Sequence, residues 1–461
     1  MPLIKSISGI RGTIGGTPGN ALTPLDIVRF TAAFGSWLKQ KNDSKKVVIG
    51  RDGRISGSVV QQLVIGTLNS LGLDVTDLDL STTPTVEIAV LEEKAAGGII
   101  LTASHNPKEW NALKLLNNKG EFISAEDGKE VLLIAEKENF SFVDVSKLGS
   151  HVVNDSYLRK HIDLILKHPL VDTKAIRERS FSVVVDAINS TGAIFVPALL
   201  MALGVEKIKT LNGEVTGKFE HNPEPLPENL IGLSKEVVKQ KADLGIAVDP
   251  DVDRLCFVCE DGSMFGEEYT LVSVADYVLS NKKGNTVSNL SSTRALKDIT
   301  EKYGGEYFPS AVGEVNVVKK MREVNAVIGG EGNGGIIDPQ LHYGRDALIG
   351  IALFLSHLAK SQKSILALRK QYPNYFISKN KIAIDKEVSV KKIQKQIREK
   401  YKNNPVNTED GLRIEFDNNW VHLRSSNTEP IIRIYAESQN ETTAQNIANR
   451  IMEDIRECMK N

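Results

Sequence analysis

The sequence has few cysteines and almost no net charge. Three cysteines in 461 residues are too few for a disulfide framework. The 57 lysines and arginines are balanced by 58 aspartates and glutamates, and a net charge of −1 provides no overall electrostatic field that could hold a polyanion. We therefore expect neither a nucleic acid nor a membrane as a partner.

Two segments that could have directed the chain to a membrane lack the required pattern. The start MPLIKSISGIRG has no apolar core of a signal peptide. The longest uncharged run, residues 187–205, contains Asn189, Ser190 and Pro197 and is too polar to span a bilayer. That run predicts a loop followed by a buried helix, and we expect a cytoplasmic protein.

Length and composition are those of a globular protein with several domains. With 41% hydrophobic and 25% charged residues, the chain is far from the disordered and fibrous extremes. At ~100–200 residues per domain, three or four domains are expected. A single small binding module is thereby excluded.

Helix and strand signals alternate through most of the chain. Thr23 and Pro24 form a cap and first-turn pair before apolar residues at helical spacing, which predicts a helix over 24–41. The β-branched run KKVVIGRD follows as a strand, and the alternation recurs from residue 181 and again from residue 267. Because strands separated by helices pair mostly in parallel, we expect three α/β domains with helices on both sheet faces.

The last ninety residues show another pattern. GLRIEF, WVHLR and IIRIYAE are successive strands joined by short turns, which predicts an antiparallel sheet, and QYPNYF at 371–376 is the expected hinge before it. The fold class is therefore α/β, with three similar mixed α/β domains and a smaller C-terminal α+β domain. The expected domains are 1–150, 151–255, 256–372 and 373–461.

The loops that follow apolar strands are the informative ones, because ligands bind at the carboxyl ends of strands in α/β sheets. After GGIIL comes TASHNP, with Ser104 and His105 on a turn favoured by Asn106 and Pro107. A serine beside a histidine is compatible with a nucleophile. It is equally compatible with a polar turn in which Ser104 bonds only to backbone.

After LGIAV, three carboxylates stand at alternate positions. Asp249, Asp251 and Asp253 would repel one another unless a hard divalent cation lay between them, and oxygen ligands suit Mg²⁺. A solvated acidic turn is one alternative. A calcium hand is another, although Arg254 replaces its required glycine. We favour Mg²⁺, because an apolar strand leads directly into the cluster.

The segment Gly329–Gly335 contains a G-x-G-x-x-G match that raises the possibility of a dinucleotide site. Pro339 follows soon after and would break the helix that should hold the pyrophosphate. A glycine loop that carries Glu331 and Asn333 better suits a hydroxylated ligand such as a sugar.

Between WVHL and IIRIY, hydroxyl and amide side chains are flanked by two arginines. This combination suits a phosphate, and a plain hairpin turn is the alternative. The residues are Arg424, Ser425, Ser426, Asn427, Thr428 and Arg433.

Two further features are less informative. Cys256 and Cys259 form a C-x-x-C pair inside the apolar run LCFVC with no second pair elsewhere, which favours core packing over zinc. Arg11 lies in the glycine-containing segment SGIRG near the N-terminus, where its side chain could reach an anion or face water.

The loops TASHNP, DPDVDR, GEGNGG and RSSNTEP, in this order, resemble those of the α-D-phosphohexomutase superfamily over essentially the whole chain. The combination is highly specific, whereas each motif alone is not. The resemblance implies four domains around a central cleft and a phosphoserine enzyme. Its activity would be the interconversion of hexose 6-phosphate and hexose 1-phosphate through a bisphosphorylated sugar, with Mg²⁺ as cofactor and a sugar bisphosphate as activator. We expect a monomer or a homodimer.

The resemblance also implies a role for each matching residue. Ser104 would carry the phosphoryl group. The residues around the reacting phosphate would be Arg11, His105, Lys114 and Arg254; the Mg²⁺ ligands Asp249, Asp251 and Asp253 together with Ser104; the sugar contacts Glu331 and Asn333; and the distal phosphate contacts Arg424, Ser426, Asn427, Thr428 and Arg433.

Two departures from the family pattern concern the general base and the sugar. Many bacterial members have a histidine where Gly335 stands here, so the base must be another group. His342 is the nearest candidate in sequence, unless it only packs against its neighbour, and Lys114 is the second if nearby arginines depress its pKa.

The loop variants Pro250, Val252 and Asn427 resemble archaeal-type phosphoglucosamine mutases and the phosphoglucomutase/phosphomannomutase group. We expect glucosamine phosphate as the substrate, with glucose and mannose phosphates as alternatives. Ser104 and Lys114 disfavour a non-catalytic sugar-phosphate sensor, and the distal phosphate loop disfavours a Mg²⁺-dependent phosphatase.

Overall fold

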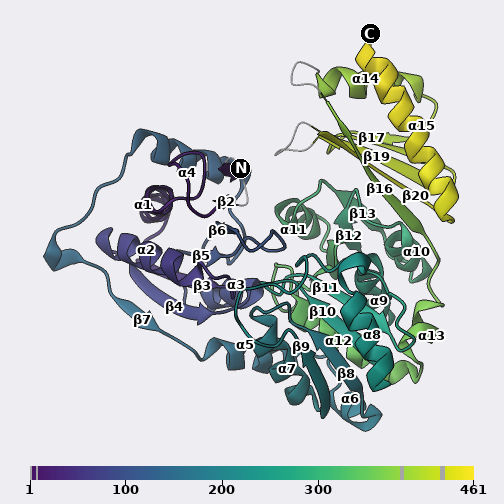
Figure 1. The fold of residues 1–461 in the computed structure, drawn as a ribbon, viewed down its shortest axis with the longest axis horizontal. Coiled ribbons are helices and arrows are strands. Elements are labelled where there is room, and N and C mark those ends of the chain that lie inside the picture. Colours follow the sequence, from purple (N-terminus) through teal and green to yellow (C-terminus); the bar gives the residue numbers. More distant parts are fainter. Residues whose placement is uncertain (1–2, 7–8, 385–388, 426–430, 461) are drawn as a thin grey trace.

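The computed structural model describes residues 3–6, 9–384, 389–425 and 431–460. Within these residues the chain forms four sheets that follow one another in sequence (Figure 1). Three are mixed sheets with helices, and the fourth is antiparallel. The predicted fold class, three α/β domains followed by a smaller α+β domain, is confirmed.

The first domain is built on a seven-stranded sheet. Its strands lie in the order β1 (Ile4–Ser6), β2 (Gly9–Thr13), β6 (Trp110–Leu116), β5 (Gly97–Leu101), β3 (Lys46–Arg51), β4 (Asp74–Leu80) and β7 (His151–Val153), and its helices are α1 (Pro24–Lys41), α2 (Gly57–Ser70), α3 (Thr83–Glu92) and α4 (Ala125–Lys137). Thr23 and Asp26 form a capping box before α1, which confirms the predicted helix over 24–41.

The second and third domains each contain a four-stranded sheet. The second has the order β11 (Leu255–Cys259), β10 (Leu244–Val248), β8 (Ser182–Asp186), β9 (Lys207–Leu211), with α5 (Tyr157–Leu166), α6 (Thr173–Arg179), α7 (Gly192–Leu203) and α8 (Ile231–Gln240). The third has the order β13 (Tyr307–Ser310), β12 (Thr286–Asn289), β14 (Ile328–Glu331), β15 (Gly335–Ile337), with α9 (Glu267–Asn281), α10 (Ala295–Lys302), α11 (Glu314–Glu323), α12 (Ala347–Ser361) and α13 (Ile365–Arg369). The predicted loop and buried helix at 187–205 are confirmed by α7, and Cys256 and Cys259 are buried in β11.

The C-terminal sheet is antiparallel throughout, as predicted. Its order is β16 (Phe376–Ala383), β20 (Ile431–Ser438), β19 (Asn419–Ser425), β18 (Leu412–Phe416), β17 (Val406–Asn407), with α14 (Val390–Lys400) and α15 (Glu441–Lys460). Figure 1 shows this domain beside the third domain, with the first domain on the other side of the molecule. The expected hinge is tied to the third domain, since the Tyr269 hydroxyl donates to the Pro373 carbonyl at 2.7 Å.

The three mixed sheets share a local feature that positions the site. The strand after each motif loop, β6, β11 or β15, runs antiparallel to the strand before it. These loops are too short for a helical crossover, so the chain folds back beside the strand it has just left. Strands joined through helices do pair in parallel, as expected.

The second and third domains share one hydrophobic core, whereas the first and the C-terminal domains have their own. α12 contacts α9 of the third domain and α6 and α7 of the second. Phe354 of α12 stacks on Phe257 of β11 with 3.8 Å between ring centroids. Among the described helices, none combines the length and the apolar composition needed to cross a bilayer.

Candidate active site

Three of the four motif loops meet in one place. TASHNP joins β5 to β6, DPDVDR joins β10 to β11, and GEGNGG spans the β14–β15 turn. Ser104 Oγ donates to Asp249 Oδ2 at 2.8 Å, which connects the first loop to the second. Arg345 donates to both Asp253 and Glu331, which connects the second loop to the third.

Ser104 lies in a constrained and buried turn. Its φ of +49° falls in the left-handed region that serine adopts rarely, and 7% of the residue is exposed. The Ser104 amide donates to Thr102 Oγ1 at 2.9 Å, and its hydroxyl also lies 3.3 Å from His105 Nδ1. The turn therefore directs the Ser104 hydroxyl toward the aspartate loop instead of toward its own backbone.

Arg54 holds this turn, and sequence reasoning missed it. Its buried guanidinium donates to the Ser104 carbonyl at 2.5 Å and to the Pro107 carbonyl at 2.7 Å. Asp52 accepts from Arg54 Nε at 3.0 Å and from Thr102 Oγ1 at 2.7 Å. An isolated arginine fifty residues before the serine carries no sequence signal for such a contact.

The three aspartates converge as the alternate spacing predicts. One carboxylate oxygen of each lies within 4.8 Å of the others, and all three residues are fully buried. Asp251 Oδ1 and Asp253 Oδ1 have no hydrogen-bond partner. Buried carboxylate oxygens without donors are costly, and a hard cation bound by oxygen ligands would satisfy them. The residues present thus fit a divalent metal.

The groups around the triad shift the pKa values of two of its carboxyls in opposite directions. Burial raises the pKa of Asp249 well above its ordinary value, and the two neighbouring carboxylates raise it further. Burial acts in the same direction on Asp253, but the positive charges of Arg345, Lys114 and Arg254 outweigh it and lower the pKa of that carboxyl. The cations around the cluster therefore stabilise the ionised form of Asp253.

Lys114 on β6 is one of these cations. Its Nζ lies 2.6 Å from Asp251 Oδ2 and 3.5 Å from Asp253 Oδ2. Burial lowers the pKa of Lys114, but the two carboxylates prevail and raise it. The depressed pKa that a lysine base would need is thus not found in this arrangement. Thr83 at the start of α3 also donates to Asp251 Oδ2, at 2.6 Å.

Three further predicted residues surround the serine. Arg254 Nη1 lies 3.1 Å from Glu224 Oε1, while Arg254 Nε is buried without a hydrogen-bond partner. Burial and the charge of Arg254 lower the pKa of Arg11 and the pKa of His105. Arg11 Nη1 lies 3.5 Å from Asn106 Oδ1 on the serine loop, and Arg254 directly follows Asp253, so two guanidinium groups lie near the serine and the triad, a setting suited to a phosphoryl group.

Glu331 is rigidly held at the end of β14. Its Oε1 accepts from Asn289 Nδ2 at 2.8 Å and from the Gly313 amide at 3.0 Å, and its Oε2 accepts from Arg345 Nη1 at 3.0 Å. Asn333 Oδ1 accepts from the Gly335 amide at 3.2 Å. The carboxylate is thus oriented by donors from three separate segments, none of which the motif itself revealed.

His342 has a different environment from the one predicted for a general base. It is buried, with Nε2 3.3 Å from Asp346 Oδ2 and Nδ1 3.3 Å from Glu87 Oε2, the latter without hydrogen-bond alignment. Burial lowers the pKa of His342, but the two carboxylates raise it to about 10. Burial raises the pKa of Glu87 to about 8, so the charge partner at neutral pH is Asp346. A protonated ring cannot accept a proton from a sugar, and this placement disfavours His342 as the base.

Replacing His342 should change stability in a pH-dependent way. Because folding raises its pKa, the ion pair stabilises the folded state most below the ordinary value of 6.5 and loses this contribution as pH rises through about 10. We expect His342→Gln to lower the free energy of unfolding by up to roughly 3–5 kcal/mol at pH 6. Urea unfolding of both proteins between pH 6 and 10 measures this difference, which should narrow with pH; a constant difference would contradict the assignment.

The fourth motif loop lies in the C-terminal domain. Arg424 and Arg433 are cross-strand partners on β19 and β20, and Arg424 Nε lies 3.3 Å from Asp410 Oδ2. Asp410 Oδ2 also accepts from the Val312 amide of the third domain at 3.0 Å. The predicted contacts Ser426, Asn427 and Thr428 lie outside the described residues.

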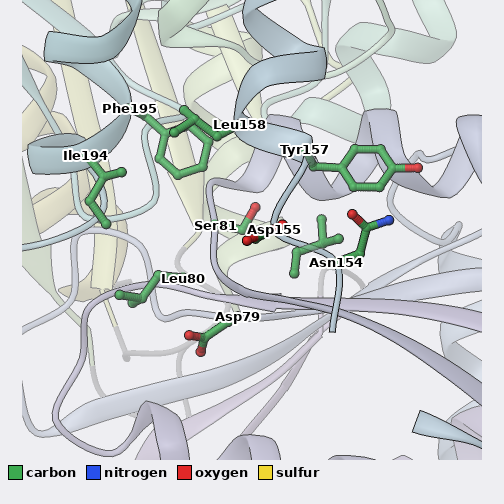
Figure 2. Close-up of a pocket in the computed structure, with 10 residues that line it drawn as sticks. Asp79, Leu80, Ser81, Asn154, Asp155, Tyr157, Leu158, Ile194 and Phe195 are labelled. Carbon is green, nitrogen blue, oxygen red and sulfur yellow. The ribbon is translucent and has the colours of Figure 1, made fainter. Parts of the chain in front are cut away.

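A separate cavity of about 210 Å³ lies where the end of β4, the segment 154–158 and the start of α7 meet (Figure 2). Asp79 and Asn154 supply polar groups, and Leu80 and Phe195 supply apolar ones. Its lining residues come from segment 78–81 of the first domain and from segments 154–158 and 194–195 of the second, and none belongs to the four motif loops.

Comparison with known families gives matches along the whole chain. Four family models match, described as phosphoglucomutase/phosphomannomutase alpha/beta/alpha domain I at 3–142, domain II at 159–262, domain III at 266–375, and the C-terminal domain at 382–454. They follow one another in the order of the four sheets.

Known proteins match over their full lengths. A phosphoglucomutase/phosphomannomutase of Thermococcus kodakarensis is 35% identical over 457 residues, covering 97% of this chain and 99% of that protein. A phosphoglucosamine/phosphogalactosamine mutase of Sulfurisphaera tokodaii is 33% identical over 450 residues, covering 96% and 97%. A crystal structure of a phosphoglucomutase/phosphomannomutase family protein from Burkholderia thailandensis is 27% identical, with a TM-score of 0.84 and coverage of 99% and 98%.

Proposed function

The chain belongs to the phosphoglucomutase/phosphomannomutase family within the α-D-phosphohexomutase superfamily and is a phosphohexomutase, and on that basis we propose that it interconverts glucosamine 6-phosphate and glucosamine 1-phosphate. The relative named a phosphoglucosamine/phosphogalactosamine mutase supports this sugar. Glucose and mannose phosphates are the alternative, supported by the relative named a phosphoglucomutase/phosphomannomutase.

One observation carries the proposed mechanism. The Ser104 hydroxyl, held by a strained turn, donates to Asp249 across two domains, beside two buried carboxylate oxygens without donors. A serine that carries a phosphoryl group must place it where charge can be compensated. Ser104 is so placed, and we assign it as the phosphoryl carrier that a sugar bisphosphate would charge.

Asp249, Asp251 and Asp253 would hold Mg²⁺ together with the phosphate on Ser104. Bound there, Mg²⁺ supplies compensation for the charge on the transferring group. Arg11 and Arg254 add fixed positive charge beside the triad, which suits a loose transition state with charge spread over its oxygens.

The proton balance concerns two oxygens. When a sugar hydroxyl attacks the phosphorus, its O–P bond forms, the bond from Ser104 Oγ breaks, and the hydroxyl must lose a proton. Lys114 Nζ lies beside the triad, 2.6 Å from Asp251 Oδ2, and Mg²⁺ held by the triad would compensate the carboxylate charges that raise the pKa of this amine. We therefore propose Lys114 as the base.

The distal phosphate contacts must serve both orientations of the sugar. The bisphosphorylated intermediate has to turn by about half a rotation, so each phosphate is distal once in the cycle. Arg424 and Arg433, side by side on two strands, are proposed to hold whichever phosphate is distal, together with Ser426, Asn427 and Thr428.

We expect Arg424→Ala to raise KM by about tenfold for the sugar 1-phosphate and the sugar 6-phosphate alike, because one charge-assisted contact is lost in both orientations. Initial rates in both directions measure this. Arg398→Ala, on the exposed face of α14 in the same domain, is the matched control and should leave KM unchanged. An effect on one substrate alone would argue against a shared distal site.

The sugar assignment is tested by comparing kcat/KM for glucosamine 1-phosphate, glucose 1-phosphate and mannose 1-phosphate, with the matching sugar bisphosphate present in each assay. We expect the glucosamine compound to exceed the other two by about tenfold or more, a ratio accessible to one well-placed polar contact. A higher kcat/KM for glucose or mannose phosphate would replace the proposed substrate without changing the class of reaction.

A further inference from the structure

Arg345 joins three carboxylates from three separate segments. Its Nη2 donates to Asp253 Oδ2 at 2.8 Å, its Nη1 to Glu331 Oε2 at 3.0 Å, and its Nε to Glu314 Oε2 at 2.8 Å. Side-chain exposure is 10% for Arg345 and at most 5% for each carboxylate. These buried ion pairs connect the DPDVDR loop (the metal loop), the GEGNGG loop (the sugar loop) and the first turn of α11.

The backbone around Arg345 fixes the direction of its side chain. The Asp346 amide donates to the Ile336 carbonyl at 2.8 Å, and the Asp346 carboxylate caps α12 by accepting from the Leu348 amide at 2.8 Å. Residue 345 is thereby pinned between β15 and α12. Its side chain has to cross β15 in order to reach Glu331 on β14.

Gly335 makes this crossing possible. It is the cross-strand partner of Glu331, and a Cβ at position 335 would lie 2.3 Å from Arg345 Cδ and 3.0 Å from Arg345 Cγ. No real Cβ tolerates the shorter distance, so any side chain at 335 would displace Arg345. The arginine stem occupies the space that glycine leaves open.

We propose that Arg345 is a positioning residue for sugar recognition: it fixes the Glu331 carboxylate relative to the metal loop, and the missing side chain at Gly335 leaves room for it. The inference rests on the proposed roles of Glu331 and Asp253. It extends them by naming a residue outside the four motifs that sets the spacing between the sugar hydroxyls and the reacting phosphate.

The chemistry of arginine explains why this residue stands here. A guanidinium offers several N–H donors in a rigid plane and stays charged at every relevant pH, so it can bond three carboxylates at once. A lysine is a single point charge that cannot reproduce this geometry. Asp253 retains its second oxygen, Oδ1, for a metal while Oδ2 is held by the arginine.

Arg345→Lys tests the geometry while keeping the charge. We expect KM for the preferred sugar phosphate to rise about tenfold and the ratio of kcat/KM between preferred and disfavoured sugars to shrink by a similar factor, since Glu331 loses its orientation. Mn²⁺ binding in the absence of sugar, measured by electron paramagnetic resonance, should stay within about threefold, because the triad and the positive charge remain. Arg322→Lys, at an ion pair with Glu121, is the matched control.

Gly335→Ala tests the same idea without altering any charge. The added methyl should displace Arg345 and reproduce the rise in KM, whereas in an Arg345→Ala background, where only the 3.1 Å contact with Asn333 Oδ1 remains, it should change kcat/KM much less. Gly66→Ala, at a helix position with open space around it, is the control. Additive effects of the two substitutions would overturn the proposal even if Arg345→Lys folds poorly.

Glu331→Gln distinguishes the proposed sugar contact of Glu331 from the proposed positioning role of Arg345. Unchanged KM in Glu331→Gln would refute the assignment of Glu331 to the sugar. Impaired Glu331→Gln together with normal sugar discrimination in Arg345→Lys and Gly335→Ala would refute the positioning role alone. Loss of Mn²⁺ binding by more than about tenfold in Arg345→Lys would also refute it, since the residue would then support the metal loop instead.

Discussion

Ser104→Ala should reduce kcat by about a thousandfold or more, because the variant has no oxygen to carry the phosphoryl group between the two ends of the sugar. Its fold should persist, since the change removes one hydroxyl and its hydrogen bond to Asp249 from a loop that Arg54 holds through carbonyls. A coupled assay with catalytic sugar bisphosphate measures the loss. Thermal unfolding within a few degrees of the wild type checks the fold.

Intact-mass spectrometry gives the same variant a second readout. Wild-type protein incubated with sugar bisphosphate should gain one phosphoryl group, and Ser104→Ala should gain none. Ser356→Ala is the matched control, because Ser356 is also buried and hydrogen-bonded but lies within α12. Near-normal turnover of Ser104→Ala would remove the serine from the mechanism.

The sequence predicted the elements of the fold well where local chemistry decides them. The Thr23–Pro24 cap, the β-branched strands and the three adjacent strands of the tail are local signals, and each gave the element found. The core shared through α12 depends on contacts between distant segments. Periodicity reports which face of an element is apolar, and it cannot report which partner covers that face.

The same distinction applies to the site. The three aspartates were predictable because alternate spacing on one short loop sends their side chains to one side. Arg54 and Arg345 were missed, because Ser104 and Asp253, which they contact, lie fifty or more residues away and neither arginine belongs to a motif. His342 was singled out by its place in the sugar-loop segment, but its burial between Asp346 and Glu87, which comes from α3 in the first domain, is not indicated by anything local.

The second large effect is expected at the metal loop. Asp251 Oδ2 accepts from Lys114 Nζ and from Thr83 Oγ1, both at 2.6 Å, and Asp251 Oδ1 is buried without a hydrogen-bond donor. In Asp251→Asn, the single amide oxygen would have to serve either these donors or the cation, and the amide nitrogen would point a donor at the other. The substitution therefore removes a ligand and one negative charge at once.

We expect Asp251→Asn to raise the Mg²⁺ concentration needed for half-maximal rate by about tenfold or more, and to lower kcat at saturating Mg²⁺ by about a hundredfold, since the transferring group loses part of its charge compensation. Titrating Mg²⁺ at fixed sugar phosphate separates the two effects. Asp43→Asn, an exposed aspartate of the first domain, controls for the change in net charge. Lys114 loses one of the two carboxylates that raise its pKa, so its pKa should fall. The pH at which the remaining rate rises should therefore be lower than in the wild type. Wild-type metal dependence in Asp251→Asn would place the cation elsewhere.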